Sequence, residues 1–200
     1  MANLNKWYKS KTYKIIMIAS LSATILLMIY PLTYPNLLNR SLSTIGREKP
    51  VWFICWGIIL SFGFALASFY LFSKIKLKIK TKWALLINSI FILLIFLVFV
   101  SKIVSVSSFG TSFIEMRIHL ISSMIFGIFA PLSLIYIFIF KVITGSKMCI
   151  IQIIATVILM MLFYSSILIS DFTALYQIIS FVLFFTIILT EVIIEIKKED

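Results

Sequence analysis

Residues 148–170 read MCIIQIIATVILMMLFYSSILIS, a run of 23 residues without a charged side chain. A helix rises 1.5 Å per residue, so about 20 apolar residues are enough to cross the hydrocarbon core of a membrane. After a single residue, Asp171, a second uncharged run covers residues 172–190. This stretch therefore predicts two transmembrane helices that are joined by a tight turn.

Four further runs of the same kind precede this pair. All six are 18 to 23 residues long and lack Asp, Glu, Lys and Arg: residues 15–34, 51–73, 84–101, 118–140, 148–170 and 172–190. Membrane strands would be shorter and would alternate in polarity. The chain is 62% hydrophobic and only 12% charged, which a soluble domain of 200 residues does not accommodate. We therefore predict an all-α polytopic membrane protein, with residues 1–200 forming a single six-helix transmembrane domain.

Lysine and arginine set the predicted orientation. With the N-terminus inside, 13 of the 18 basic residues fall on the inner side and 5 on the outer side, which is the bias of cytoplasmic loops. Both termini are therefore expected to be cytoplasmic. The Lys- and Ile-rich composition is typical of bacteria and predicts the plasma membrane of such a cell. The net charge of +11 lies beside apolar runs, so membrane lipids are the expected partners and nucleic acid is not.

The first outer loop, residues 35–50, combines hydroxyl groups, a glycine and three cations. Arginine side chains and backbone N–H groups bind anionic groups well. The candidates for binding a lipid headgroup are Arg40, Ser43, Gly46 and Arg47, with Arg117 of the second outer loop. The alternative is a solvated connector that leads into a helix opened by Pro50.

This loop also carries a resemblance. Its Ser43-Thr44-Ile45-Gly46 element, the glycines of the second run, and Glu115 and His119 at the start of the fourth resemble the bacterial domain-of-unknown-function family 998. That family is related to the eukaryotic FRAG/DRAM/Sfk membrane proteins. The resemblance implies six helices and, through the eukaryotic relatives, a role connected with lipids.

Acidic residues and the only histidine are also predicted on the outer side. Glu115 and His119 are four residues apart and share one helix face, while Asp171 lies in the third outer turn. We expect Glu115 or Asp171 to pair with His119, Arg40 or Arg47, because unpaired charges are costly at this depth. The three residues Glu115, His119 and Asp171 are the candidate catalytic groups. The alternative is that His119 only anchors the helix at the interface.

Small residues recur at helical spacing in the second run. Gly57, Ser61, Ala65 and Ser68 form one stripe, and Gly63 and Ala67 form a pair on a neighbouring face. In the fourth run Gly127 precedes Pro131 by four residues. Small residues let helix backbones approach closely in lipid, so we predict helix packing at Gly57, Ser61, Ala65 and Gly127.

The predicted function is coarse. The first hypothesis is a non-enzymatic protein that recognises lipid or scaffolds a membrane-protein partner or a second copy of itself. The alternatives are a lipid-active enzyme that uses Glu115, His119 and Asp171, and a small-solute transporter. The lack of Asp, Glu, Lys and Arg within the six runs counts against ion coupling. One histidine and two separate cysteines do not make a zinc site, so neither a metal nor a cofactor is expected.

The topology has a direct test. In a chain with Cys55 and Cys149 replaced by alanine, an impermeant thiol reagent added outside should label cysteines introduced at Ser43 and Ser108. It should not label cysteines at Lys78 and Ser146, which are predicted to be cytoplasmic. Labelling at Lys78 from outside would overturn the predicted orientation.

Overall fold

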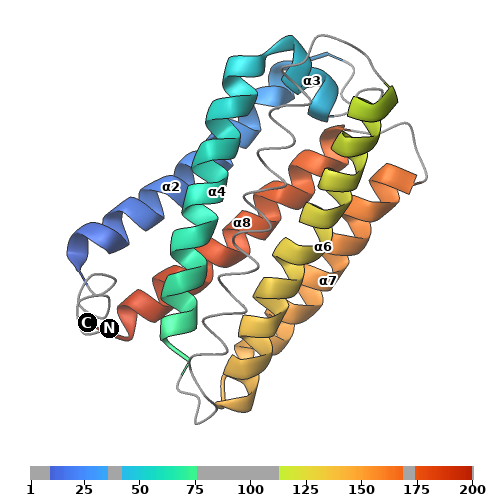
Figure 1. Ribbon diagram of the computed structural model, residues 1–200. Coiled ribbons are helices and arrows are strands. Elements are labelled where there is room, and N and C mark those ends of the chain that lie inside the picture. The colour runs from blue at the N-terminus through green and yellow to red at the C-terminus, as the bar shows by residue number, and fades with distance from the viewer. Residues whose placement is uncertain (1–9, 36–41, 76–112, 169–173, 200) are drawn as a thin grey trace.

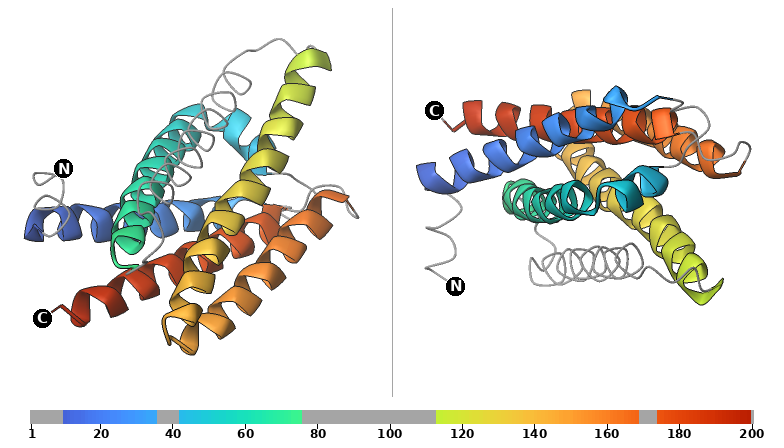
Figure 2. Two further views of the ribbon diagram at one scale, coloured as in Figure 1. Left: turned by 60° about the horizontal axis from the view of Figure 1, so that its bottom comes forward. Right: turned by 90° about the horizontal axis from the view of Figure 1, so that it is seen from above.

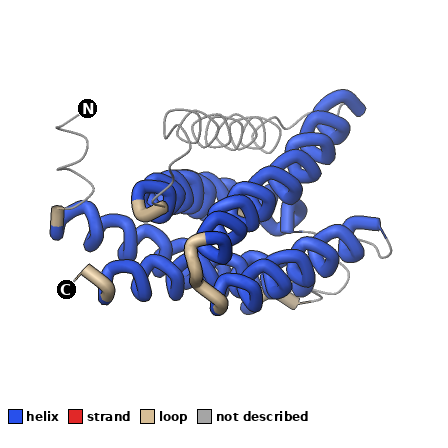
Figure 3. Tube along the Cα trace, turned by 90° about the horizontal axis from the view of Figure 1, so that it is seen from below, coloured by secondary structure: helices blue, strands red, loops and turns tan. Residues whose placement is uncertain are grey.

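The structure, a computed structural model, describes residues 10–35, 42–75, 113–168 and 174–199, and these residues contain helices and no strand (Figures 1 and 3). The elements in chain order are α2 (Lys11–Ile29), the 3₁₀ turn η1 (Tyr30–Thr33), α3 (Leu42–Glu48), α4 (Pro50–Ser73), α6 (Phe113–Ile143), α7 (Met148–Leu168) and α8 (Ala174–Lys197). The all-helical class is therefore confirmed for the described part of the chain.

Four helical segments within these residues are long and apolar enough to cross a membrane. They are Lys11–Thr33, Pro50–Ser73, Met148–Ser165 and Ala174–Lys197. A shorter apolar segment, Gly127–Ile143, belongs to the 31-residue helix α6. The predicted third span, residues 84–101, lies outside the described residues, so the count of six stays a prediction. The predicted sixth span ended at Thr190, whereas α8 continues to Lys197 and takes Glu191 and Glu195 into the helix.

Helix α8 is the centre of the packing. The helix α2 packs between α4 and α8, and α7 packs between α6 and α8, while α4 also contacts α8 directly. Figure 2 shows α2 and α8 running side by side with α6 crossing the bundle at an angle. Half of the apolar window of α8 is buried, against about a sixth of that of α7. Groups on the buried side of α8 can therefore contact several other helices.

The two ends of the bundle differ in character. At one end α2 and α7 begin and α4, α6 and α8 end (Figure 1), and we call this the charged end because Lys14, Lys74, Lys141 and three glutamates lie there. At the other end of α2 and α4, aromatic rings gather. Trp52 donates a hydrogen bond from Nε1 to the carbonyl of Leu27 over 3.0 Å.

The predicted first outer loop is only partly a loop. Its residues 42–48 form α3, whose Leu42 and Ile45 are buried in the core, so the expectation of a wholly solvated connector is corrected. The backbone N–H of Leu42 donates to Oε1 of Gln177 in α8 over 3.0 Å. Gly46 lies so close to the ring of Phe53 that an added Cβ would come within 2.6 Å of it. Apolar burial and one buried hydrogen bond thus hold α3 against the bundle.

Helix α4 approaches α2 closely at Gly63. A Cβ at this position would lie 3.1 Å from Cβ of Ser20 and 3.3 Å from the backbone nitrogen of Leu21. In the predicted stripe Gly57 is buried, and Ser61 and Ala65 are half-buried. Packing through Gly57 and Ala65 stays a prediction, while the pair of Gly63 and Ala67 is the one that faces α2 or the core.

Replacing Gly63 with leucine should force α2 and α4 apart. We expect Gly63→Leu to destabilise the protein in detergent by about 1–3 kcal/mol, the usual cost of overpacking a filled site. Ala19→Leu is the matched control, because Ala19 is exposed on α2 and the added bulk meets no helix of the described part of the chain. Thermal unfolding followed by circular dichroism measures both. Equal melting temperatures for the two variants would contradict the close approach.

Candidate functional site

Three glutamates at the end of α8 form an acidic stripe. Glu191, Glu195 and Glu199 follow one another at intervals of four residues, so they lie near one side of the helix and its short extension. The first two are buried, with 3% and 8% of their surface exposed. Carboxylates in an apolar bundle need partners, because an isolated buried charge is very costly.

Lys141 of α6 is the principal partner of these two buried carboxylates. Its ammonium group, on a side chain that is only 7% exposed, donates to Oε1 of Glu191 and, over 2.8 Å, to Oε1 of Glu195. At the rim, Lys198 donates to the same oxygen of Glu195 over 2.6 Å. Since Glu195 accepts this hydrogen bond, the pKa of Lys198 is raised and its ammonium group stays charged at neutral pH. Two carboxylates and two ammonium groups thus balance in charge.

Helix α7 joins this cluster through an amide. Nε2 of Gln152 donates to Oε2 of Glu191 over 2.7 Å, so both oxygens of this carboxylate are used. The backbone carbonyl of Gln152 accepts a hydrogen bond from the hydroxyl of Thr156, which is fully buried. The side-chain carbonyl of Gln152 is buried and has no hydrogen-bond partner among the described residues. The buried cluster of Lys141, Gln152, Glu191 and Glu195 therefore connects α6, α7 and α8.

The last carboxylate of the stripe, that of Glu199, contacts α2 and the end of α4. Glu199 pairs with Lys14 of α2 over 2.6 Å and with Lys74, directly after α4. Lys74 also lies over the ring of Tyr70, 4.9 Å from its centre. One acidic stripe thus contacts lysines or an amide from each of α2, α4, α6 and α7.

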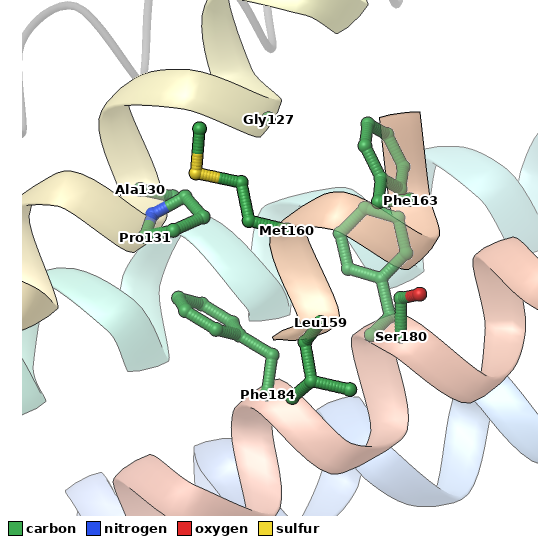
Figure 4. Close-up of a pocket in the computed structure, with 9 residues that line it drawn as sticks. Gly127, Ala130, Pro131, Leu159, Met160, Phe163, Ser180 and Phe184 are labelled. Carbon is green, nitrogen blue, oxygen red and sulfur yellow. The ribbon is translucent and has the colours of Figure 1, made fainter. Parts of the chain in front are cut away.

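A crevice with apolar walls lies between the same three helices that hold the buried cluster. It is lined by residues of α6 (Gly127, Ala130, Pro131), α7 (Leu159, Met160, Phe163) and α8 (Ser180, Phe181, Phe184). Figure 4 shows the side chains of Met160, Pro131 and Phe184 around its centre. It is partly open and shallow, with about 360 Å³ of empty space when its open side is included. Seven residues of α8, or about 10 Å of helix, separate Phe184 from Glu191.

Glycine and proline shape the α6 wall of the crevice. A Cβ on Gly127 would lie 2.6 Å from the ring of Phe163 and 3.2 Å from the hydroxyl of Tyr164, so the glycine permits the close approach of α6 to α7. Tyr164 reaches across to the carbonyl of Met124 over 2.8 Å. Pro131 has no N–H to donate to the carbonyl of Gly127, so the helical hydrogen bond is missing where the crevice lies.

The structure describes only some of the residues of the predicted outer sites. Arg40 and Asp171 lie outside the described residues, and for Ser43, Arg47, Glu115, Arg117 and His119 the structure describes the helix but not the side chain. The pairing of these residues stays a prediction. The described residues place Gly46 against Phe53 and Gly127 against Phe163. No group of three His, Cys, Asp or Glu among the described residues is arranged to hold a metal ion.

The sequence reasoning missed the acidic stripe and Lys141. It treated Lys141 and Glu191 as charges that only mark the ends of spans, because each directly follows an apolar run. Two signals were present. Three of the chain's seven acidic residues recur at intervals of four in Glu191, Glu195 and Glu199, and Gln152 is the only amide in its run. The predicted sixth span, residues 172–190, contains no charged residue, but α8 continues beyond it and takes in Glu191, Glu195 and Lys197.

The fold and composition together define an all-helical membrane protein, with apolar helices of spanning length around a buried ionic cluster. No protein family, curated protein or solved structure matches the chain.

Removing Lys141 should leave buried carboxylates uncompensated. We expect Lys141→Met to cost about 3–5 kcal/mol of stability, which is typical when one partner of a buried ion pair is deleted. Lys197→Met is the control, because Lys197 is exposed and such changes fall within about 0.5 kcal/mol. Denaturant unfolding in detergent micelles compares them. A cost for Lys141→Met no larger than for Lys197→Met would show that the cluster is not buried.

Proposed function

We propose that this protein is a non-enzymatic membrane protein that recognises lipid, and that it holds a single apolar chain in the crevice between α6, α7 and α8. The supporting observation is a partly open crevice between apolar helices, whose lining is apolar apart from the Ser180 hydroxyl and backbone. Its α7 and α8 residues lie within two segments of spanning length.

The walls suit an acyl or isoprenoid chain. Three phenylalanines, a leucine and a methionine line the crevice, and empty apolar cavities of this kind are poorly filled by water. A chain that enters gains dispersion contacts that a void does not provide. The unbranched side chain of Met160 adapts to irregular shapes. Because the crevice is small and partly open, we propose that it takes only part of a narrow chain, while a bulky ring system requires the helices to move apart.

The distribution of the basic residues supports a proposed orientation in the membrane. We propose that the charged end faces the cytoplasm and that the membrane is the plasma membrane, since 13 of 18 basic residues fall on that side in the predicted topology. At this end Lys11, Lys147, Lys197 and Lys198 are exposed. Their charges favour the anionic headgroups of the cytoplasmic leaflet.

One observation favours a second candidate, small-solute transport coupled to a cation. Ionisable residues buried in membrane helices often mark proton or ion pathways, and Glu191 and Glu195 are such residues. Against this, Lys141, Gln152 and Lys198 already satisfy both carboxylates. We therefore rank lipid recognition first.

Photocrosslinking tests lipid recognition. The purified protein is reconstituted into nanodiscs that contain a trace of a palmitic acid analogue with a diazirine near the chain end, irradiated, and digested for mass spectrometry. We expect adducts on the crevice segments of α6, α7 and α8, and we expect an excess of unlabelled phospholipid to suppress them.

Two neighbouring methionines provide a matched pair of variants. Met160→Trp fills the crevice and should abolish the suppressible adducts, whereas Met161→Trp places the same ring on the outer face of α7, where Met161 is 65% exposed, and should leave them intact. Adducts spread evenly over the exposed faces, and equal in both variants, would remove the basis for the proposal.

A further inference from the structure

The crevice and the buried ionic cluster lie between the same three helices, α6, α7 and α8. The contacts of the cluster set how these helices are held together next to the crevice. Helix α7 lies between α6 and α8. Lys141 joins α6 directly to α8, and Gln152 joins α7 to α8 at the same level. The crevice opens between these helices about 10 Å further along α8.

The ionic contacts resist separation of the helices. Lys141, Glu191 and Glu195 are each less than 10% exposed, so parting α6 from α8 would leave charges unpaired in an apolar surrounding. The two contacts of Lys141 are to carboxylates one helical turn apart, which also fixes the position of α6 along α8.

Above this contact α6 has a natural point of bending. Pro131 lies ten residues before Lys141 and lines the crevice, and proline is the usual cause of a bend in a helix. Because Pro131 itself lines the crevice, a bend of α6 at this residue that moved the charged end of the helix would also change the width of the crevice.

We propose that Lys141, Glu191 and Glu195 form a latch that holds α6 against α8 and limits how far the crevice between α6, α7 and α8 opens. The claim that the latch controls lipid entry rests on the proposed function. The claim that it limits the opening of the crevice does not, because opening depends only on the fold. With the latch closed the crevice admits a narrow chain. With the latch released α6 pivots at Pro131 and larger apolar molecules enter.

The rate at which a thiol placed in the crevice reacts with a reagent measures how often the crevice opens. Ser180 lines the crevice and is 4% exposed, so Ser180→Cys, in a chain with Cys55 and Cys149 replaced by alanine, places a nearly isosteric thiol there. The probe is N-ethylmaleimide, applied to the protein in nanodiscs. The latch is removed by Lys141→Met with Glu191→Gln, which deletes one charge of each sign and leaves Glu195 paired with Lys198. This double variant avoids the unpaired charge of a single substitution.

We expect the double variant to react about tenfold faster than the parent, the change that follows from a loss of about 1.4 kcal/mol in closing free energy. Lys197→Met, an exposed charge deletion on the same helix, should react at the parent rate. Equal rates in the double variant and the parent overturn the latch, as does an equal acceleration by Lys197→Met.

A charge exchange covers the case in which the double variant is unstable. Lys141→Glu with Glu191→Lys restores an ion pair between α6 and α8 and should return the rate towards that of the parent. A folded exchange variant that reacts as fast as the double variant contradicts the latch. The lipid proposal fails separately: if the parent gives no suppressible photoadduct, lipid recognition is wrong, whatever the thiol rates are.

Discussion

The structure depends on the need to keep the carboxylates of α8 paired inside an apolar bundle. Glu191 and Glu195 are almost fully buried, and an uncompensated charge in that position costs several kcal/mol. The requirement determines where α6 and α7 end up, because Lys141 and Gln152 must reach the same carboxylate. Apolar packing alone specifies such positions weakly, since leucine and phenylalanine side chains make comparable contacts in many arrangements.

The same helix organises the other half of the bundle. Glu199, one turn further on, pairs with Lys14 and Lys74, so α2 and α4 are held at the charged end by the same stripe. Farther along the bundle the specificity comes from close approach instead. Gly63 brings α4 onto α2, and Gly127 brings α6 onto α7. Ionic contacts at one end thus join α8 to the other helices, whereas close approach along the length joins α2 to α4 and α6 to α7.

Between α6, α7 and α8 the described residues leave a crevice where packing is incomplete. Pro131 lies at its edge and lacks the N–H that would complete the helical hydrogen bond to Gly127. A bundle that needed only stability would fill such a space. An apolar crevice next to a bending point and above an ionic contact is better suited to admitting a chain, and this combination connects the proposed lipid recognition with the proposed latch.

The sequence by itself determined the class of fold and most helix positions, because uncharged runs of about 20 residues have few alternatives to a membrane helix. The second span, predicted at residues 51–73, is the helix Pro50–Ser73, and the fifth begins at Met148 as predicted. The alternative of a solvated connector at residues 35–50 does not hold for residues 42–48, because the burial of Leu42 and Ile45 depends on α4 and α8 and not on local composition.

Only the tertiary structure decided which charged residues pair with one another inside the bundle. In the sequence Lys141 and Glu191 are 50 residues apart, and each looks like an ordinary charge at the boundary of an apolar run. Hydropathy treats every such boundary alike, since it averages along the chain and carries no information on which helices are neighbours. The pairing of Lys141 with the acidic stripe arises because α6, α7 and α8 come together, and that arrangement is a property of packing between segments distant in sequence.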